Sequence, residues 1–363
     1  MTIPIHNLYY MLCYAWNRLE EGEIIPVGQV DKDEVSQLFA KVLLEGTFHL
    51  FKRGLDRGYV SYSDEIQRIR GKIDFYQNIK RNFCRQPRLY CHYDEFDYDI
   101  LHNQILKATI KNMIGCKGLK EELKEQLKSL VFRLHNVSDL FLRKTVFRQV
   151  QLHRNNSFYD FMIKVCELIY DNLLILKDGK GRRFRDFVQD EKVMSIIFEE
   201  FVRNFYERHL ANYQVRRSYI EWQLEPISDG AKAYLPRMET DITLLSTKRK
   251  KKIIIDTKYY NQTLSSGNKI RSDNLYQLFA YVKNQEGSGP FSMQCDGILL
   301  YPAVDRGYNL SYKIDGHKIF IRTINLNQDW RDIEKDLLAI VKEAGEEEPP
   351  VHSGAVLDEA GGL

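Results

Sequence analysis

Apolar residues recur at three- and four-residue spacing along much of the chain, a pattern typical of helices that bury one face. Within residues 7–19, the apolar side chains fall at positions 8, 9, 11, 12 and 15. The same spacing predicts further helices over residues 35–51, 103–134 with a break at 115–118, 159–176, 191–210, 273–282 and 330–344.

Shorter runs rich in β-branched and aromatic residues lie between these segments and predict strands. They are residues 59–62, 72–75, 216–222, 239–245, 252–259, 297–301 and 319–324. We therefore expect an α/β (α+β) fold. A chain of 363 residues is long for one core, and the change in pattern indicates two domains, 1–160 and 161–344. The tail 345–363, with Pro-Pro, glycines and acids, is predicted to be disordered.

Composition and charge exclude several classes of protein. The chain is 44% hydrophobic and 28% charged, which is a globular composition, and no apolar run approaches the roughly 20 residues of a membrane span. The net charge of +3 does not by itself indicate a nucleic-acid binder. Six scattered cysteines without a CxxC pair argue against zinc and disulfides. We expect a cytoplasmic protein with no membrane partner.

Three polar side chains fall on two predicted neighbouring strands. Asp241 lies in 239–245, and Asp256 and Lys258 lie in 252–259. If these strands pair in antiparallel fashion, both aspartates meet at one end of the sheet, and Asp256 and Lys258 share a face. Two converging carboxylates need a divalent cation between them, and oxygen ligands suit Mg²⁺ or Mn²⁺. With a lysine that orients water or offsets charge, such a site hydrolyses phosphodiesters.

An Asp-x-Lys sequence alone is more often a solvated strand end than an active site. Here an apolar run leads into it, a second aspartate precedes it, and acidic and polar residues stand on the flanking helices. These helix residues, which we regard as auxiliary, are Glu199, Gln277 and Tyr281. The combination favours a catalytic site.

At these residues the sequence resembles the PD-(D/E)xK nuclease superfamily and, within it, the McrC family of nuclease subunits from McrBC modified-cytosine-dependent restriction systems. The resemblance covers roughly residues 3–342. Its most specific motif is L-P-R-M-E-T-D-I at 235–242, since D-x-K alone would be weak. The other matching strings are Asn7–Leu12, Tyr14–Trp16, Ile69–Ile73, Asp256–Tyr260 and Asn274–Leu278.

The resemblance implies an endonuclease domain in residues 161–344, with a mixed central sheet flanked by helices. Asp241 and Asp256 would bind the metal, and Lys258 would be the catalytic lysine. Glu199 matches the helix acid of many members, and Gln277 with Tyr281 matches the Q-x-x-x-Y helix of a subset. Thr240 stands where the superfamily motif has proline, a departure that costs little because the carboxylate supplies the ligand.

The resemblance also implies partners. Residues 1–160 would engage and stimulate an McrB-like AAA+ GTPase oligomer, and methylated double-stranded DNA, carrying 5-methylcytosine, would be the substrate of this type IV restriction system. GTP would be bound by the partner, because the chain has no G-x-x-x-x-G-K-[ST] loop. We find no methylated-base reader either, so this subunit would need only shape and phosphate contacts.

Several basic side chains are candidates for contacts with the DNA backbone beside the site. They are Lys248, Arg249, Lys250, Lys251, Arg182 and Arg183. A solvated hairpin tip explains residues 248–251 equally well, and the basic stretch 68–88 could bind DNA or insert into a partner.

Two rival functions also stay open: a regulatory activator of an NTPase with a silent nuclease site, and a stand-alone repair nuclease. The intact Asp241, Asp256 and Lys258 disfavour the first, and the large first domain disfavours the second. We expect a Mg²⁺-dependent endodeoxyribonuclease that is active with its partner.

Overall fold

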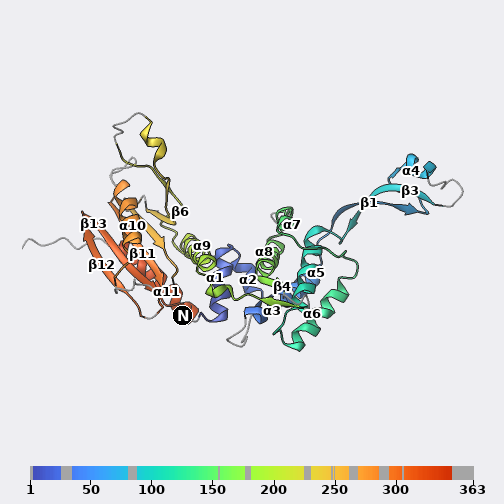
Figure 1. Cartoon of the computed structure of the whole chain (residues 1–363), viewed down its shortest axis with the longest axis horizontal. Helices are drawn as coiled ribbons and strands as arrows, with labels where there is room; N and C mark the ends of the chain where they lie inside the picture. The colour runs from blue at the N-terminus through green and yellow to red at the C-terminus, as the bar shows by residue number, and fades with distance from the viewer. Residues whose placement is uncertain are drawn as a thin grey trace, which may run out of the picture. The chain divides into compact units, whose positions relative to one another are not determined.

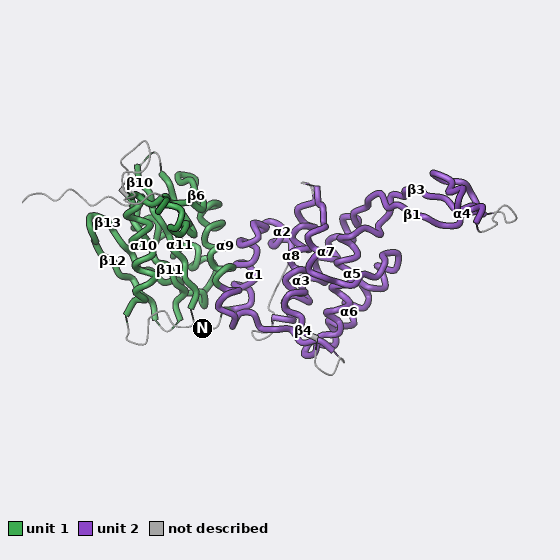
Figure 2. The backbone as a smooth tube through the Cα atoms, turned by 45° about the horizontal axis from the view of Figure 1, so that its top comes forward, with its two compact units in different colours: residues 1–3, 195–363 green, residues 4–194 purple. Residues whose placement is uncertain are grey.

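The computed structural model describes residues 3–25, 35–80, 88–153, 156–175, 181–224, 230–246, 248, 250–260, 269–285, 294–304 and 306–345. The chain forms two compact units, residues 4–194 and residues 1–3 with 195–363 (Figure 2). The predicted boundary at residue 160 is therefore too early. Helix α8 (Ser157–Asn172) contacts α3 (Val35–Arg53) and α5 (Leu101–Ile114) and belongs to the first unit. The predicted tail after Gly345 lies outside the described residues.

Helices make up most of the unit formed by residues 4–194. Besides α3, α5 and α8 they are α1 (Ile5–Ala15), α2 (Leu19–Glu23), α6 (Glu121–Arg133) and α7 (Lys144–Arg148). Strands β4 (Leu173–Ile175) and β5 (Arg182–Phe184) pair as a short antiparallel ladder, followed by the 3-10 turn Phe187–Gln189. The predicted break between α5 and α6 is confirmed, and Gly118 takes a left-handed backbone there, with φ 89°.

A β-arm extends from this helical unit. Strands β1 (Gly58–Ile66) and β3 (Leu89–Asp97) pair in antiparallel fashion along their nine residues, and β2 (Lys72–Ile73) adds to β3. Figure 1 shows helix α4 (Phe75–Lys80) at the far end of the arm. The small sheet predicted here is confirmed.

A six-stranded mixed sheet forms the centre of the second unit. Its order is β12-β13-β11-β10-β9-β6. β10 (Lys251–Thr257), β11 (Gln294–Pro302) and β13 (His317–Ile324) are parallel, whereas β9 (Ile242–Ser246), β6 (Gln214–Arg216) and β12 (Asn309–Ile314) pair antiparallel with their neighbours. A separate two-stranded ladder joins β7 (Tyr219–Ile220) to β8 (Met238–Glu239), and the 3-10 turn Ala231–Tyr234 precedes β8.

Helices pack against this sheet. Helix α10 (Ser272–Asn284) lies on β10 and β11, where Leu278 and Val282 join Ile254 in one apolar core. Gly297 permits this close approach, since a Cβ there would lie 2.9 Å from Leu278. Helix α11 (Trp330–Gly345) contacts β10 and β13 and packs against α9 (Glu191–His209), where the rings of Trp330 and Phe201 lie 5.5 Å apart.

Two predicted strands are each divided between two sheets in the structure. The segment 216–222 is split between β6 and β7, and the segment 239–245 between β8 and β9. Strand β12 was not predicted, although Leu310, Tyr312 and Ile314 alternate with polar residues, because it is a short edge strand whose residues are mostly exposed. None of the described helices has the length and apolarity that crossing a bilayer requires. The five cysteines in the described ranges are buried and form no disulfide with one another.

Candidate active site

Asp241 and Asp256 are neighbours at one end of the central sheet. Strands β9 and β10 pair in antiparallel register from Lys251↔Ser246 to Ile255↔Ile242, so the two aspartates occupy the next position of the same ladder. The predicted antiparallel pairing is thus present. Lys258 follows β10 directly, and its backbone N–H donates to the carbonyl of Leu300 on β11 over 3.0 Å.

Thr257 fixes the orientation of Asp241. The Oδ2 atom of Asp241 accepts the backbone N–H of Thr257 at 2.8 Å and its hydroxyl at 3.0 Å. Thr257 is buried, and Asp241 is partly exposed. One carboxylate oxygen is therefore held by the neighbouring strand, while the side chain keeps access to solvent and ligands.

Lys258 is the ionic partner of Asp256. Its Nζ lies 3.1 Å from Oδ1 and 2.9 Å from Oδ2 of the fully buried Asp256 carboxylate. Burial raises the pKa of Asp256 to about 7, with Lys258 opposing the rise and Asp241 and Glu199 adding to it. Burial alone would lower the pKa of Lys258, but the charges of Asp256 and Asp241 outweigh it and raise that pKa. The lysine is therefore held in its charged form.

Glu199 reaches the same site from helix α9. Burial raises its pKa, the negative charge of Asp241 adds to the rise, and Arg217 opposes it. Arg217 donates to the Glu199 carboxylate, and Arg203 does so at 3.4 Å. The structure therefore brings Glu199 into the electrostatic field of Asp241, but it holds this acid in an arginine network that the sequence did not reveal.

Gln277 and Tyr281 form a pair on helix α10. The Gln277 amide donates to the Tyr281 hydroxyl at 2.7 Å. Tyr281 is buried, and burial raises its pKa, with the charges of Asp256 and Asp241 adding to the effect. This electrostatic influence places the Tyr281 hydroxyl in the surroundings of the carboxylates. The one-turn spacing of the Q-x-x-x-Y motif thus corresponds to a direct contact.

The donor set fits a hard divalent cation. Asp241 and Asp256 offer carboxylate oxygens, and the buried Oδ2 of Asp256 has the Lys258 ammonium 2.9 Å away as its ionic partner. Within the described ranges, no three His, Cys, Asp or Glu side chains are grouped closely enough to hold an ion by themselves. Two carboxylates completed by water and phosphate oxygens are the usual arrangement for Mg²⁺. The carboxylates of Asp241 and Asp256 therefore fit Mg²⁺ or Mn²⁺.

Thr240, which stands in the place of proline, has a structural role. Its backbone N–H donates to the Ser218 carbonyl at 3.0 Å, and its hydroxyl accepts the Ser218 N–H at 3.0 Å. Proline has no N–H and could not make the first bond. The departure from the motif thus attaches the segment before Asp241 to the β7 region.

The structure corrects the predicted contacts with the DNA backbone. Lys251 is buried and its Nζ lies 3.1 Å from Oδ2 of the buried Asp296, so it is not available to a phosphate. Lys248 and Lys250 are exposed, but they stand at the opposite end of β10 from Asp256, about 20 Å away at 3.3 Å per residue. The hairpin turn therefore does not lie beside the carboxylates.

The remaining candidates are not part of the unit that carries the carboxylates or are not described. Arg182 and Arg183 lie on β5, in the unit of residues 4–194. Arg249 is outside the described residues. Sequence reasoning missed Thr257 and Arg217; the first stands inside the D-T-K string and could have been noticed, but nothing local marks the second.

A mixed sheet with two aspartates and a lysine at one end of two neighbouring strands is the arrangement expected of a PD-(D/E)xK nuclease domain. A family model, the McrBC 5-methylcytosine restriction system component, matches residues 5–302. The chain is 34% identical over 350 residues to the Type IV methyl-directed restriction enzyme EcoKMcrBC of Escherichia coli (strain K12), covering 94% of this chain and 98% of that relative. The chain therefore belongs to the McrBC restriction system component family, which confirms the family predicted from its motifs.

A solved structure shares the fold. A chain in the refined half-complex from the tetradecameric assembly of Thermococcus gammatolerans McrB AAA+ hexamers with bound McrC aligns with a TM-score of 0.59 at 16% identity, covering 93% of this chain and 75% of that one. A chain in the cryo-EM structure of the Thermococcus gammatolerans McrBC complex aligns with a TM-score of 0.41 at 19% identity, over 58% of this chain and 60% of that one. The first match confirms the predicted mixed α/β fold class.

Proposed function

We propose that this chain is the metal-dependent endonuclease subunit of a 5-methylcytosine-dependent restriction complex, which hydrolyses DNA phosphodiesters and stimulates a GTP-hydrolysing AAA+ partner. The convergence of Asp241, Asp256 and Lys258 at one end of the central sheet carries this proposal. Membership of a restriction-system family supports a nuclease in general. The metal and the reaction are inferred from the side chains.

Each side chain has a role in this proposal. Asp241 and Asp256 hold Mg²⁺, which supplies Lewis-acid activation of the phosphoryl oxygen when it is bound. Lys258 stays charged beside Asp256 and donates to the attacking water or to the phosphate oxygen as negative charge develops. Glu199, together with the Gln277–Tyr281 pair, positions water or the carboxylates of Asp241 and Asp256.

The partner in this proposal is an McrB-like AAA+ GTPase oligomer, and GTP binds to it. The half-complex aligned above combines McrB AAA+ hexamers with bound McrC. In the present chain, the β-arm offers a surface for a protein partner, because Phe75, Tyr76 and Ile79 of α4 are 69–71% exposed. Exposed apolar clusters of this kind mark interaction sites. They favour insertion into a partner over DNA binding for the basic stretch 68–88.

A cleavage assay tests the proposal. Methylated and unmethylated duplexes are incubated with Mg²⁺, with and without the AAA+ partner and GTP. We expect cleavage of methylated DNA by the complete mixture. Asp241→Ala, Asp256→Ala and Lys258→Ala should each abolish cleavage. Among these three variants, only Lys258→Ala should still bind the metal. Wild-type cleavage by Asp256→Ala would refute the assignment. GTPase stimulation without any cleavage would favour the regulatory alternative, and cleavage without a partner would favour a stand-alone nuclease.

A further inference from the structure

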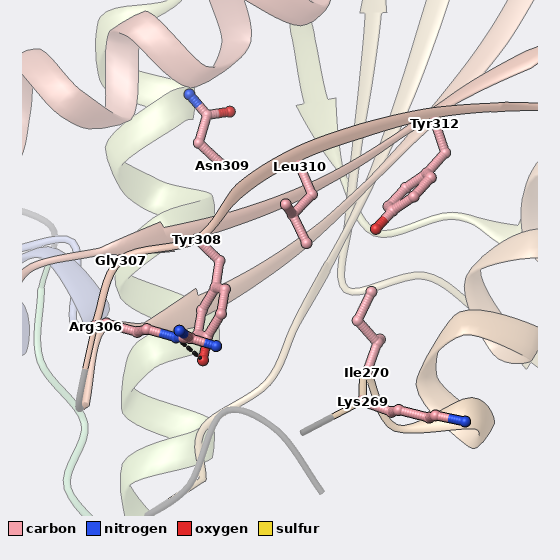
Figure 3. A pocket seen from close by; sticks show the side chains of 8 residues that line it. All are labelled: Lys269, Ile270, Arg306, Gly307, Tyr308, Asn309, Leu310 and Tyr312. Atoms are coloured by element: carbon pink, nitrogen blue, oxygen red, sulfur yellow. Dashed lines mark hydrogen bonds between the residues drawn. The ribbon is translucent and has the colours of Figure 1, made fainter. Parts of the chain in front are cut away.

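A cavity of about 600 Å³ opens beside the edge strand β12. Figure 3 shows it between the segment that precedes α10 and the start of β12. The residues that line it are Lys269, Ile270, Arg306, Gly307, Tyr308, Asn309, Leu310 and Tyr312. None of these eight residues is acidic, and two are cationic.

The lining combines an apolar floor with aromatic and basic walls. Leu310 and Ile270 pack against the apolar core beneath α10, and Tyr308, Leu310 and Tyr312 project to the same side in Figure 3, as strand alternation requires. The Arg306 guanidinium lies 4.8 Å above the Tyr308 ring, and its Nε donates to the Tyr308 hydroxyl at 2.6 Å. Such a lining suits a flat, partly apolar group that carries a negative charge.

Strand register places this cavity at the same edge of the sheet as the carboxylates. Asn309 pairs with Arg322 near the carboxyl end of β13, and β13 runs parallel to β11 and β10. Three strand intervals separate β12 from β10, about 14 Å in all. This separation corresponds to roughly four nucleotides of a B-form strand at 3.4 Å each.

We propose that the cavity binds one unpaired nucleotide of the DNA strand that passes the carboxylates. This inference rests on the proposed nuclease function. The base would lie on Leu310 and Ile270 and stack against Tyr312, while Arg306 and Lys269 contact the adjacent phosphates. Base stacking on aromatic side chains and cationic contacts to the backbone are the two elements of single-strand binding. A peptide from a protein partner is disfavoured. An apolar side chain in the cavity would offer no negative charge to Arg306 and Lys269.

Binding of a fluorescent duplex tests this inference. The probe is a duplex with one bulged 2-aminopurine, compared with the same duplex fully paired, and EDTA prevents cleavage. We expect the full chain to bind the bulged duplex about tenfold more tightly and to change the 2-aminopurine emission. Tyr312→Ala should reduce this preference to less than about twofold. Arg306→Ala should lower the slope of log affinity against log salt by about 0.9, as expected for one lost phosphate contact.

The matched control is Lys313→Ala. Lys313 stands next to Tyr312 on β12 but points to the other face of the strand, so this variant should keep the full preference for the bulge. Each variant is first checked for the wild-type thermal midpoint, and Tyr312→Leu replaces Tyr312→Ala if the latter unfolds.

Equal affinity of the wild type for both duplexes, or an unchanged preference in Tyr312→Ala, would overturn the inference. Loss of affinity for the AAA+ partner instead of DNA would show a peptide site. Since EDTA separates binding from cleavage, a bulge preference of the isolated chain, together with no cleavage by the complete mixture of chain, AAA+ partner, GTP and Mg²⁺, would refute the nuclease function and not this subsite.

Discussion

Asp241 accepts two hydrogen bonds from Thr257, the residue that separates Asp256 from Lys258. The first carboxylate is therefore positioned by the same strand that carries the second carboxylate and the lysine. A displacement of 1 Å in a catalytic group can reduce a rate a hundredfold. We therefore regard Thr257 as a positioning residue that acts through Asp241.

Replacement of Thr257 by valine should therefore reduce cleavage. Valine keeps the shape and the backbone N–H but removes the hydroxyl that donates to Asp241. A hydrogen bond to a charged group contributes about 1.5–3 kcal/mol, so we expect at least a tenfold loss in kcat of the complex. Thr257→Ser keeps the hydroxyl and should retain most of the activity. A Thr257→Val enzyme that cuts at the wild-type rate would show that the hydroxyl does not position Asp241.

Metal affinity should rise with pH up to about pH 7. The pKa of Asp256 is about 7, so below that pH a proton competes with the cation for this carboxylate. Mg²⁺ or Mn²⁺ binding, measured by calorimetry, should strengthen by up to about tenfold per pH unit and then level off. Asp256→Asn should bind weakly and without this dependence. A flat profile in the wild type from pH 5 to 8 would contradict the prediction.

The stability of the metal-free protein should change in the opposite direction. The folded pKa of Asp256 lies above its ordinary value of 3.8, so the native state keeps a proton that the unfolded chain has lost. The free energy of unfolding therefore falls as pH rises from about 4 to about 7, by at most about 1.4 kcal/mol per unit from this group. Urea unfolding in EDTA should show this decline in the wild type and a smaller one in Asp256→Asn.

The sequence predicted what depends on local pattern. Asp241, Asp256 and Lys258 stand in short strings, and strand alternation with one antiparallel pairing is enough to bring them together. The partners of Lys251 and Glu199 depend on packing between distant segments: Asp296 is 45 positions beyond Lys251, and Arg217 is 18 beyond Glu199. The turn at 248–250 differs, because the predicted antiparallel pairing already puts it at the end of the strands opposite the aspartates, which favours the alternative of a solvated hairpin tip.

The buried pair formed by Lys251 and Asp296 should be important for stability. Both side chains are almost inaccessible, and Asp296 also accepts the Lys318 N–H at 2.9 Å. Asp296→Asn would leave the Lys251 charge buried without its counter-ion, and breaking such a pair costs about 3–5 kcal/mol. Chemical denaturation should show a loss of about this size. Lys248→Ala, a change at an exposed position of the neighbouring turn, should stay within about 0.5 kcal/mol. A loss below 1 kcal/mol for Asp296→Asn would contradict the assignment.

A fragment of residues 1–194 should fold, whereas a fragment of residues 1–160 should not. The shorter one removes Phe161, Val165 and Ile169, which are fully buried on α8, and it leaves the α8-contacting faces of α3 and α5 exposed. We expect a cooperative thermal transition only for the longer fragment, which should also raise the GTP turnover of the partner. Stimulation by residues 195–363 alone would contradict the proposed division of roles. A cooperative transition in residues 1–160 would show that α8 is dispensable.

DNA binding by the isolated chain should depend on the carboxyl edge of the sheet and not on the basic turn. Arg271 lies at that edge, with its guanidinium 4.2 Å from the centre of the Tyr260 ring, two residues beyond Lys258, whereas Lys248 and Lys250 lie at the opposite end of β10. Arg271→Ala should therefore weaken binding and lower the salt slope by about 0.9. The double variant Lys248→Ala, Lys250→Ala serves as the control and should change neither. Both effects should be equal for methylated and unmethylated duplexes, because phosphate contacts carry no base information. Discrimination between the two duplexes by the isolated chain would show that it contains a base reader of its own.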